Sequence, residues 1–254
     1  MSRSWALYVR ELQALFLSPV AYIAAIVTLL TLGGTFVYSL WALTAYAPEF
    51  NQQQLIQCFC GSMIFFWFVQ IGLPTAITMR LFAEEKRSGT IETLMTAPVS
   101  DVQVVLAKYL GAVTFYLMLW LPTLFFFVFL GSRDLDAGLI ASAYLGVVLM
   151  SALYIAVGCL ISALCTSQIV AAIVCFIVLM GVSFGPLLLM NVPVDSEAFK
   201  ACVAYVNIFP LGDHSLLGDG GRGLVTLAHL VYPVSAIACC LFLTVRVLES
   251  RSWR

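Results

Sequence analysis

Five long stretches of this 254-residue chain contain no lysine, arginine, aspartate or glutamate: residues 12–48, 50–79, 109–132, 137–194 and 223–245. Apolar side chains dominate each of them, and about 20 such residues in a helix cross the roughly 30 Å of hydrocarbon in a bilayer. A water-soluble fold needs charged surface along much of its length. These stretches therefore predict an all-α integral membrane protein, because helices satisfy their own backbone hydrogen bonds in lipid.

Polar and helix-breaking residues divide the apolar sequence into six predicted transmembrane helices. Their ranges are 20–44, 55–79, 103–130, 138–164, 168–190 and 227–248. The fourth and fifth spans are separated only by CTSQ, at 165–168, which predicts a tight antiparallel hairpin. Pro74 and Pro122 fall inside spans and are expected to kink them.

The composition excludes several classes of protein. The chain is 62% hydrophobic and 10% charged, against about 25% charged residues in a soluble domain. Its net charge of −1 does not suit a nucleic-acid binder. Neither His214 nor His229 has a partner at metal-binding helical spacing, and no G-x-x-x-x-G-K-[ST] phosphate loop is present. We expect no catalytic residue, metal site or cofactor in this chain.

Residues 1–18 have the pattern of an amphipathic helix. Its apolar stripe is formed at helical spacing by Trp5, Tyr8, Val9, Leu12, Leu15 and Phe16. The other faces carry Arg3, Arg10, Glu11 and Gln13. This pattern predicts a helix lying in the membrane interface, which Ser18-Pro19 ends.

The distribution of basic residues predicts the orientation, because lysine and arginine accumulate on the cytoplasmic side. With the N-terminus inside, nine lie on the inner side: Arg3, Arg10, Arg80, Lys86, Arg87, Lys108, Arg246, Arg251 and Arg254. Three lie on the outer side: Arg133, Lys200 and Arg222. We therefore expect both termini and the loop between the second and third spans to be cytoplasmic.

That loop, residues 80–102, concentrates charge. Seven of the 12 basic and 13 acidic residues of the chain lie in it: Arg80, Glu84, Glu85, Lys86, Arg87, Glu92 and Asp101. Residues 80–87 are predicted to continue the second span as a helix, until Ser88-Gly89-Thr90 interrupts it.

A second short helix is predicted within the same loop. Ile91, Leu94 and Met95 recur at i, i+3 and i+4, and Thr96-Ala97-Pro98 ends the pattern. Ser100 with Gln103 forms a capping box that starts the third span. By spacing alone, this amphipathic helix is either a connector that rests on the membrane surface or a coupling element that another protein binds and moves.

Residues 191–226 are predicted to form short broken helices that dip into the outer leaflet. They combine several leucines with glycines at 212, 218, 220, 221 and 223, which forbid one long helix. Within the spans, almost no ionisable residue marks a pathway of the kind that proton- and ion-coupled carriers use. If the chain transports, its energy must come from another protein acting on the loop at 80–101.

Residues 78–112, TMRLFAEEKRSGTIETLMTAPVSDVQVVLAKYLGA, closely resemble the cytoplasmic signature of ABC type-2 transporter permeases. The family pattern stands here at residues 84–87, 88–92 and 96–100, with Lys108 before Gly111. The likeness is greatest to the gliding-motility-associated and nitrous-oxide-maturation branch. The terminal sequences RELQALFLSPVAYI and FLTVRVLESRSWR also look like that branch.

The resemblance implies one transmembrane domain over 1–254, with an interfacial elbow helix, a coupling helix between spans two and three, and re-entrant-like outer helices between spans five and six. Such permeases dimerise and dock onto two copies of a separate ATP-binding subunit, which holds ATP and magnesium. The coupling residues it implies are Arg80, Glu84, Glu85, Lys86, Arg87, Ser88, Gly89, Thr90, Ile91, Glu92, Leu94, Met95 and Pro98.

We therefore expect the permease subunit of an ATP-driven exporter in a bacterial cytoplasmic membrane, without enzymatic activity of its own. The alternative is a non-transporting membrane anchor for an ABC-type ATPase that assembles a surface or motility apparatus. A third possibility, a channel or carrier working alone, requires pathway charges that the spans lack. The apolar spans suit lipid, glycolipid, peptide or drug equally, and homodimer and heterodimer are both compatible with the sequence.

Overall fold

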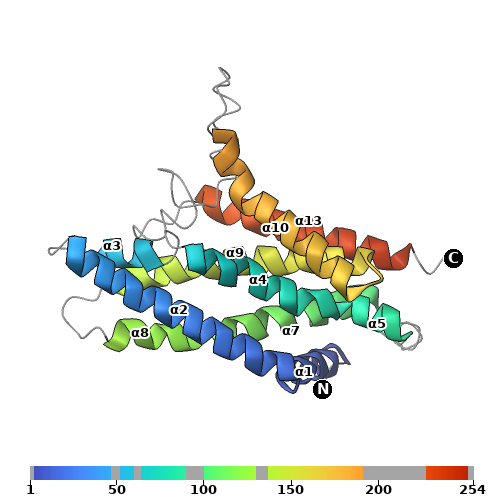
Figure 1. Cartoon of the computed structure of the whole chain (residues 1–254). Coiled ribbons are helices and arrows are strands. Elements are labelled where there is room, and N and C mark those ends of the chain that lie inside the picture. The colour runs from blue at the N-terminus through green and yellow to red at the C-terminus, as the bar shows by residue number, and fades with distance from the viewer. Residues whose placement is uncertain are drawn as a thin grey trace.

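The computed structural model describes residues 3–46, 52–59, 64–89, 100–129, 137–190 and 227–250, and within these ranges its regular elements are all helical. Six helical segments are long and apolar enough to cross a membrane (Figure 1). They cover Ala21–Ala45, Phe65–Arg87, Asp101–Phe127, Ala137–Leu164, Gln168–Pro186 and Leu230–Glu249. The predicted all-α membrane fold is thereby confirmed.

The first two helices meet at the predicted break. Helix α1 spans Arg3–Phe16 and helix α2 spans Pro19–Tyr46, with Leu17 and Ser18 forming the turn. Proline is well suited to the first position of a helix, where its missing N–H would have no partner. The apolar side of α1 packs against a later helix, α7 (Asp101–Trp120), where the Tyr8 hydroxyl donates to Thr114 Oγ1 at 3.0 Å.

The second span begins later than predicted. Helix α3 (Gln52–Gln57) occupies the first part of the range expected for the span, and the membrane-length helix α4 runs over Ile64–Leu81. The apolar stretch is longer than one crossing requires, since 18 helical residues already cover about 27 Å. Its first turns therefore form a helix of their own.

The charged segment after α4 continues the helical span to Arg87, as predicted, but with one interruption at Phe82 that the sequence did not indicate. Phe82 forms a turn with φ −122° and ψ −35°, and α5 then spans Ala83–Ser88. The break occurs because the N–H groups of Phe82 and Ala83 donate to a hydroxyl on another helix. At the other end Gly89 adopts φ +73°, a left-handed conformation that favours glycine, so the predicted interruption at 88–90 is confirmed at Gly89.

The third span starts with the predicted capping box and contains a break at its proline. Ser100 Oγ accepts from the Gln103 N–H, and the Gln103 side chain accepts from the Ser100 N–H. Helix α7 ends at Trp120, a 3-10 turn η2 (Leu121–Thr123) contains Pro122, and α8 continues over Leu124–Phe129. Proline cannot donate the next helical hydrogen bond, which accounts for the change of winding.

Helix α9 (Ala137–Leu164) forms the centre of the bundle and contacts α4, α7, α10 (Gln168–Met190) and α13 (Leu227–Glu249). The predicted hairpin between α9 and α10 is confirmed, because only residues 165–167 separate them. In the most apolar part of each span, 67% of the residues of α9 are buried within the chain, but only 11% of those of α13. Much of α13 therefore faces lipid or another subunit.

Close packing and a polar network join α9 to its neighbours. At Gly158 an added Cβ would lie 2.7 Å from the Cβ of Thr78, so α4 and α9 approach closely only because this residue is glycine. Deeper in the bundle, the Gln70 amide donates to Ser151 Oγ at 3.0 Å and accepts from the Tyr116 hydroxyl at 2.6 Å. These bonds satisfy polar groups that would otherwise be costly to bury in the membrane.

Figure 1 shows α1, α5 and the C-terminal end of α13 at one end of the bundle, and α3 and α8 at the other. The predicted short outer helices at 191–226 lie outside the described residues, as do Ile91, Leu94 and Met95 of the predicted amphipathic helix.

Candidate functional site

The sequence-predicted coupling residues fall into two groups. Arg80 lies in the last turn of α4, Glu84 to Ser88 lie in α5, and Gly89 follows directly. The others lie outside the described residues: Thr90, Ile91, Glu92, Leu94, Met95 and Pro98. The site that the structure describes is therefore α5 and the helix ends to which it is attached.

The start of α5 is attached to the end of α9 by one hydroxyl. Ser162 is fully buried, and its Oγ accepts from the N–H of Phe82 at 3.1 Å and from the N–H of Ala83 at 3.2 Å. The first N–H groups of a helix have no partner within that helix, and a serine side chain commonly caps them. Here the cap comes from a residue about 80 positions away, so α5 is capped only while it is docked.

Lys86 makes a second connection between the same two helices. Its Nζ atom donates to the carbonyl oxygens of Ala163 and Cys165, the latter at 3.3 Å. These carbonyls stand at the end of α9, where the negative end of the helix dipole favours a cation. Lys86 and Ser162 therefore attach α5 to α9 from both sides of the interface.

An ion cluster attaches α5 to α7 and α1. Lys108 Nζ lies 2.7 Å from Glu85 Oε1 and 3.1 Å from Glu11 Oε2. The Lys108 side chain is only 3% exposed, and those of Glu11 and Glu85 are 13% and 20% exposed. Removing an ion from water costs several kcal/mol, so a buried ammonium is stable only with partners as close as these.

Two further contacts adjoin the cluster. Arg10 Nη2 donates to Glu11 Oε1 at 2.7 Å, and the Phe82 ring centroid lies 5.5 Å from Lys108 Nζ. Burial alone would raise the pKa of Glu11, but the charge of Lys108, together with Arg10, outweighs it and the pKa is lowered below its ordinary 4.5. Glu11 is therefore a carboxylate at neutral pH.

The family model of the ABC-2 family transporter proteins matches residues 43–212, which is more than half of the chain. The chain belongs to the ABC-2 transporter family. No curated protein sequence matches it closely enough to serve as a relative. Members of this family are multi-pass membrane subunits that generally work with an ABC ATP-binding subunit and are typically not catalytic themselves.

The matched region of this ABC-2 protein includes α4, α5, α7 and α9, and hence Glu85, Lys86, Lys108 and Ser162. Helix α1, which supplies Glu11, lies before it. Helix α5 is attached to the ends of α9, α7 and α1. A displacement of α5 must therefore move those helix ends or break the contacts. The arrangement suits the transmission of movement.

Sequence reasoning did not identify three residues of this ABC-2 site. Lys108 entered only as a basic residue near the start of the third span and as part of the family signature, Glu11 only as a polar position off the apolar stripe, and Ser162 not at all. A lysine several residues inside an apolar helix does signal a buried partner. No local pattern identifies Glu11 as that partner, because 97 positions separate the two residues.

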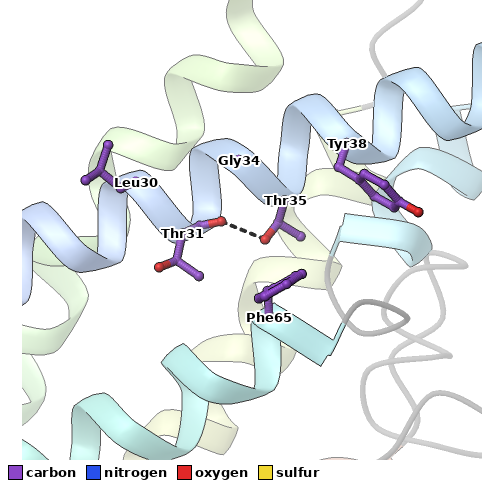
Figure 2. Close-up of a pocket in the computed structure, with 6 residues that line it drawn as sticks. All are labelled: Leu30, Thr31, Gly34, Thr35, Tyr38 and Phe65. Carbon is purple, nitrogen blue, oxygen red and sulfur yellow. Dashed lines mark hydrogen bonds between the residues drawn. The ribbon is translucent and has the colours of Figure 1, made fainter.

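The permease also has an apolar groove of about 430 Å³ between α2 and the start of α4. Figure 2 shows its lining: Leu30, Thr31, Gly34, Thr35, Tyr38 and Phe65. The Thr35 hydroxyl donates to the carbonyl of Thr31 at 2.7 Å, so it is already satisfied within its own helix. The lining carries no charged side chain and therefore suits apolar groups.

Proposed function

We propose that this chain is the permease subunit of an ATP-driven exporter, moved by a separate ATP-binding subunit that grips the segment between α4 and α7. ATP and magnesium belong to that partner, two copies of which act on a dimer of permease chains. Binding of ATP closes the partner subunits, and their closure displaces the coupling segment at residues 80–102. The permease then rocks its helices and exposes a path to the outside.

The observation that carries this proposal is the attachment of α5 to three other helices. Ser162 and Lys86 join it to α9, while the ion pairs of Lys108 with Glu85 and Glu11 join it to α7 and α1. A loop that merely connected two spans would not need buried charge and backbone-capping contacts of this kind. With these contacts, a force on the segment after Gly89 reaches the central helix α9 directly.

The orientation is part of the proposal. The excess of basic residues on the side of α1, α5 and the end of α13 supports a cytoplasmic location for that end of the bundle. A cytoplasmic ATP-binding subunit would then have access to α5 and to the residues that follow it. The resemblance of residues 78–112 supports a bacterial cytoplasmic membrane and the gliding-motility-associated or nitrous-oxide-maturation branch.

Co-purification tests whether the segment is the docking element. The full-length chain would be co-expressed with its ABC ATP-binding subunit, with residues 90–97 replaced by a glycine–serine linker of equal length. The linker variant is expected to insert into the membrane and to lose the ATP-binding subunit. A matched control replaces residues 130–136, between α8 and α9, and should retain it. Unchanged co-purification of the 90–97 variant would place the docking element elsewhere.

The alternative, a membrane anchor that assembles a surface or motility apparatus, uses the same attachment of α5 and differs only in cargo movement. Inside-out vesicles containing both subunits distinguish the two. An exporter accumulates components of a cell extract inside the vesicles when ATP is added, and this accumulation stops when residues 90–97 are replaced. If the chain is an anchor, the ATP-binding subunit hydrolyses ATP and no component of the extract accumulates.

A further inference from the structure

A polar pocket of about 430 Å³ lies where α1, α4, α5 and α7 meet. Its charged lining residues are three cations and three carboxylates: Arg10, Arg80, Lys108, Glu11, Glu84 and Glu85. Leu15, Leu81 and Ser18 also line it. It therefore combines charged groups with an apolar wall, and it is distinct from the docked interface of α5 with α9.

Arg80 differs from the other cations of this pocket. Lys108 is paired with Glu85 and Glu11, and Arg10 is paired with Glu11. The Arg80 guanidinium makes one long hydrogen bond in the described part of the chain, from Nη1 to Ser18 Oγ at 3.4 Å. Its Nε atom is buried and has no acceptor there, and none of the described carboxylates forms an ion pair with it.

A buried guanidinium nitrogen without an acceptor is a donor that a bound anion would satisfy. Leaving such a donor unsatisfied costs free energy, more so for a charged group. Guanidinium presents its N–H groups in a planar fork that matches two oxygens of a phosphate or carboxylate. Lys108 and Arg10 are already paired with Glu85 and Glu11, so Arg80 is the cation of this lining that forms no ion pair with a described residue.

The depth of Arg80 favours the phosphate of a lipid. Arg80 is the penultimate residue of α4, which begins at Ile64, and a helix of this length spans about 27 Å, close to the thickness of the hydrocarbon. Arg80 therefore stands at the level of the lipid headgroups. Leu15 and Leu81 border the same pocket and offer apolar contact to the glycerol and the first methylenes of the chains.

We propose that this pocket binds an anionic phospholipid, whose phosphate is held by the guanidinium of Arg80. The site would fix the end of α4 relative to α1 at the membrane surface. Lipid binding at this site does not depend on the ATP-binding subunit. It can therefore be tested independently of the proposal that the chain is an exporter subunit.

The test measures lipid binding to the purified full-length chain in a non-ionic detergent by native mass spectrometry, with phosphatidylglycerol as the probe. Arg80→Gln is expected to lower the affinity for the first bound lipid by roughly tenfold to a hundredfold, because it removes charge-assisted hydrogen bonds. Arg80→Lys keeps the charge but lacks the fork, and should show a smaller loss. It also provides a readout if the glutamine variant does not fold.

Arg246→Gln is the matched control, because Arg246 also lies at the end of a membrane helix and is 62% exposed beside Glu249. It should bind phosphatidylglycerol like the unmodified chain.

Equal binding by Arg80→Gln and the unmodified chain, or equal binding of dioleoylglycerol and phosphatidylglycerol, would overturn the proposal. So would displacement of the lipid by millimolar inorganic phosphate, which would assign the pocket to a soluble anion. Loss of the ATP-binding subunit from Arg80→Gln with lipid binding intact would assign the guanidinium to a carboxylate of that partner.

Discussion

Lys108 Nζ lies 2.7 Å from Glu85 Oε1, and this contact joins the third membrane span to the short helix α5 that follows the second. The same ammonium lies 3.1 Å from Glu11 Oε2 on α1. One buried cation therefore sets the relative positions of three helices. The mechanical role that we propose for α5 depends on this cluster and on its cap from α9.

Replacing Lys108 with methionine should destabilise the protein by roughly 3 kcal/mol, because it leaves two carboxylates in a largely buried site without their cation. Equilibrium unfolding in mixed micelles measures the free energy of unfolding. Arg246→Gln removes an exposed ion pair and should change this free energy by less than about 0.5 kcal/mol. A triple variant that also carries Glu11→Gln and Glu85→Gln should recover part of the loss. Equal stability of Lys108→Met and the unmodified protein would exclude a structural role for the cluster.

Acid should weaken the attachment of α1. Burial raises the pKa of Glu11 but Lys108 and Arg10 outweigh it, so the folded pKa lies below the ordinary 4.5. A carboxylate with a lowered folded pKa contributes stability that is complete above pH 4.5 and is lost as the pH falls through the folded pKa. The midpoint of thermal unfolding, compared between the unmodified chain and Glu11→Gln, should differ at pH 7, and the difference should shrink as the pH falls below 4.5. A difference that stays constant over this range would contradict the prediction.

Gly158→Ala should destabilise the bundle by about 1–3 kcal/mol, since its Cβ would lie 2.7 Å from the Cβ of Thr78 on α4. Thr78→Ala should give little rescue, because its own Cβ remains in place. Gly34→Ala is the matched control in another membrane helix, where nothing lies within 4 Å of the added atom. It should be neutral or slightly stabilising through helix propensity. Equal unfolding midpoints for the two alanine variants would show that α4 and α9 do not approach this closely.

Ser162→Ala tests the transmission of movement. It removes the acceptor of two N–H groups at the start of α5, so α5 should loosen from α9 at a cost of about 1–3 kcal/mol. The ATP-binding subunit should still co-purify, but ATP-dependent accumulation in vesicles should fall several-fold. Ser235→Ala is the control, because that exposed hydroxyl donates only to the Tyr232 carbonyl of its own helix. Normal accumulation with Ser162→Ala would show that this cap does not transmit movement.

The sequence by itself determined the class of the fold and most helix boundaries. Stretches without charge dictate membrane helices, because lipid offers backbone groups no hydrogen-bond partner. Local chemistry also fixed the capping box at Ser100, the break at Pro19 and the turn at Gly89, since each depends only on residues close in the chain. The family signature at 78–112 correctly indicated the ABC-2 family.

Only the tertiary structure decided which helix ends meet. Phe82 interrupts the expected continuous helix because Ser162, distant in sequence, accepts its N–H. Lys108 is buried because Glu11 and Glu85 converge on it from helices before and after the second span. Such pairings depend on how the other helices pack around α9, and packing brings together residues that no local pattern relates.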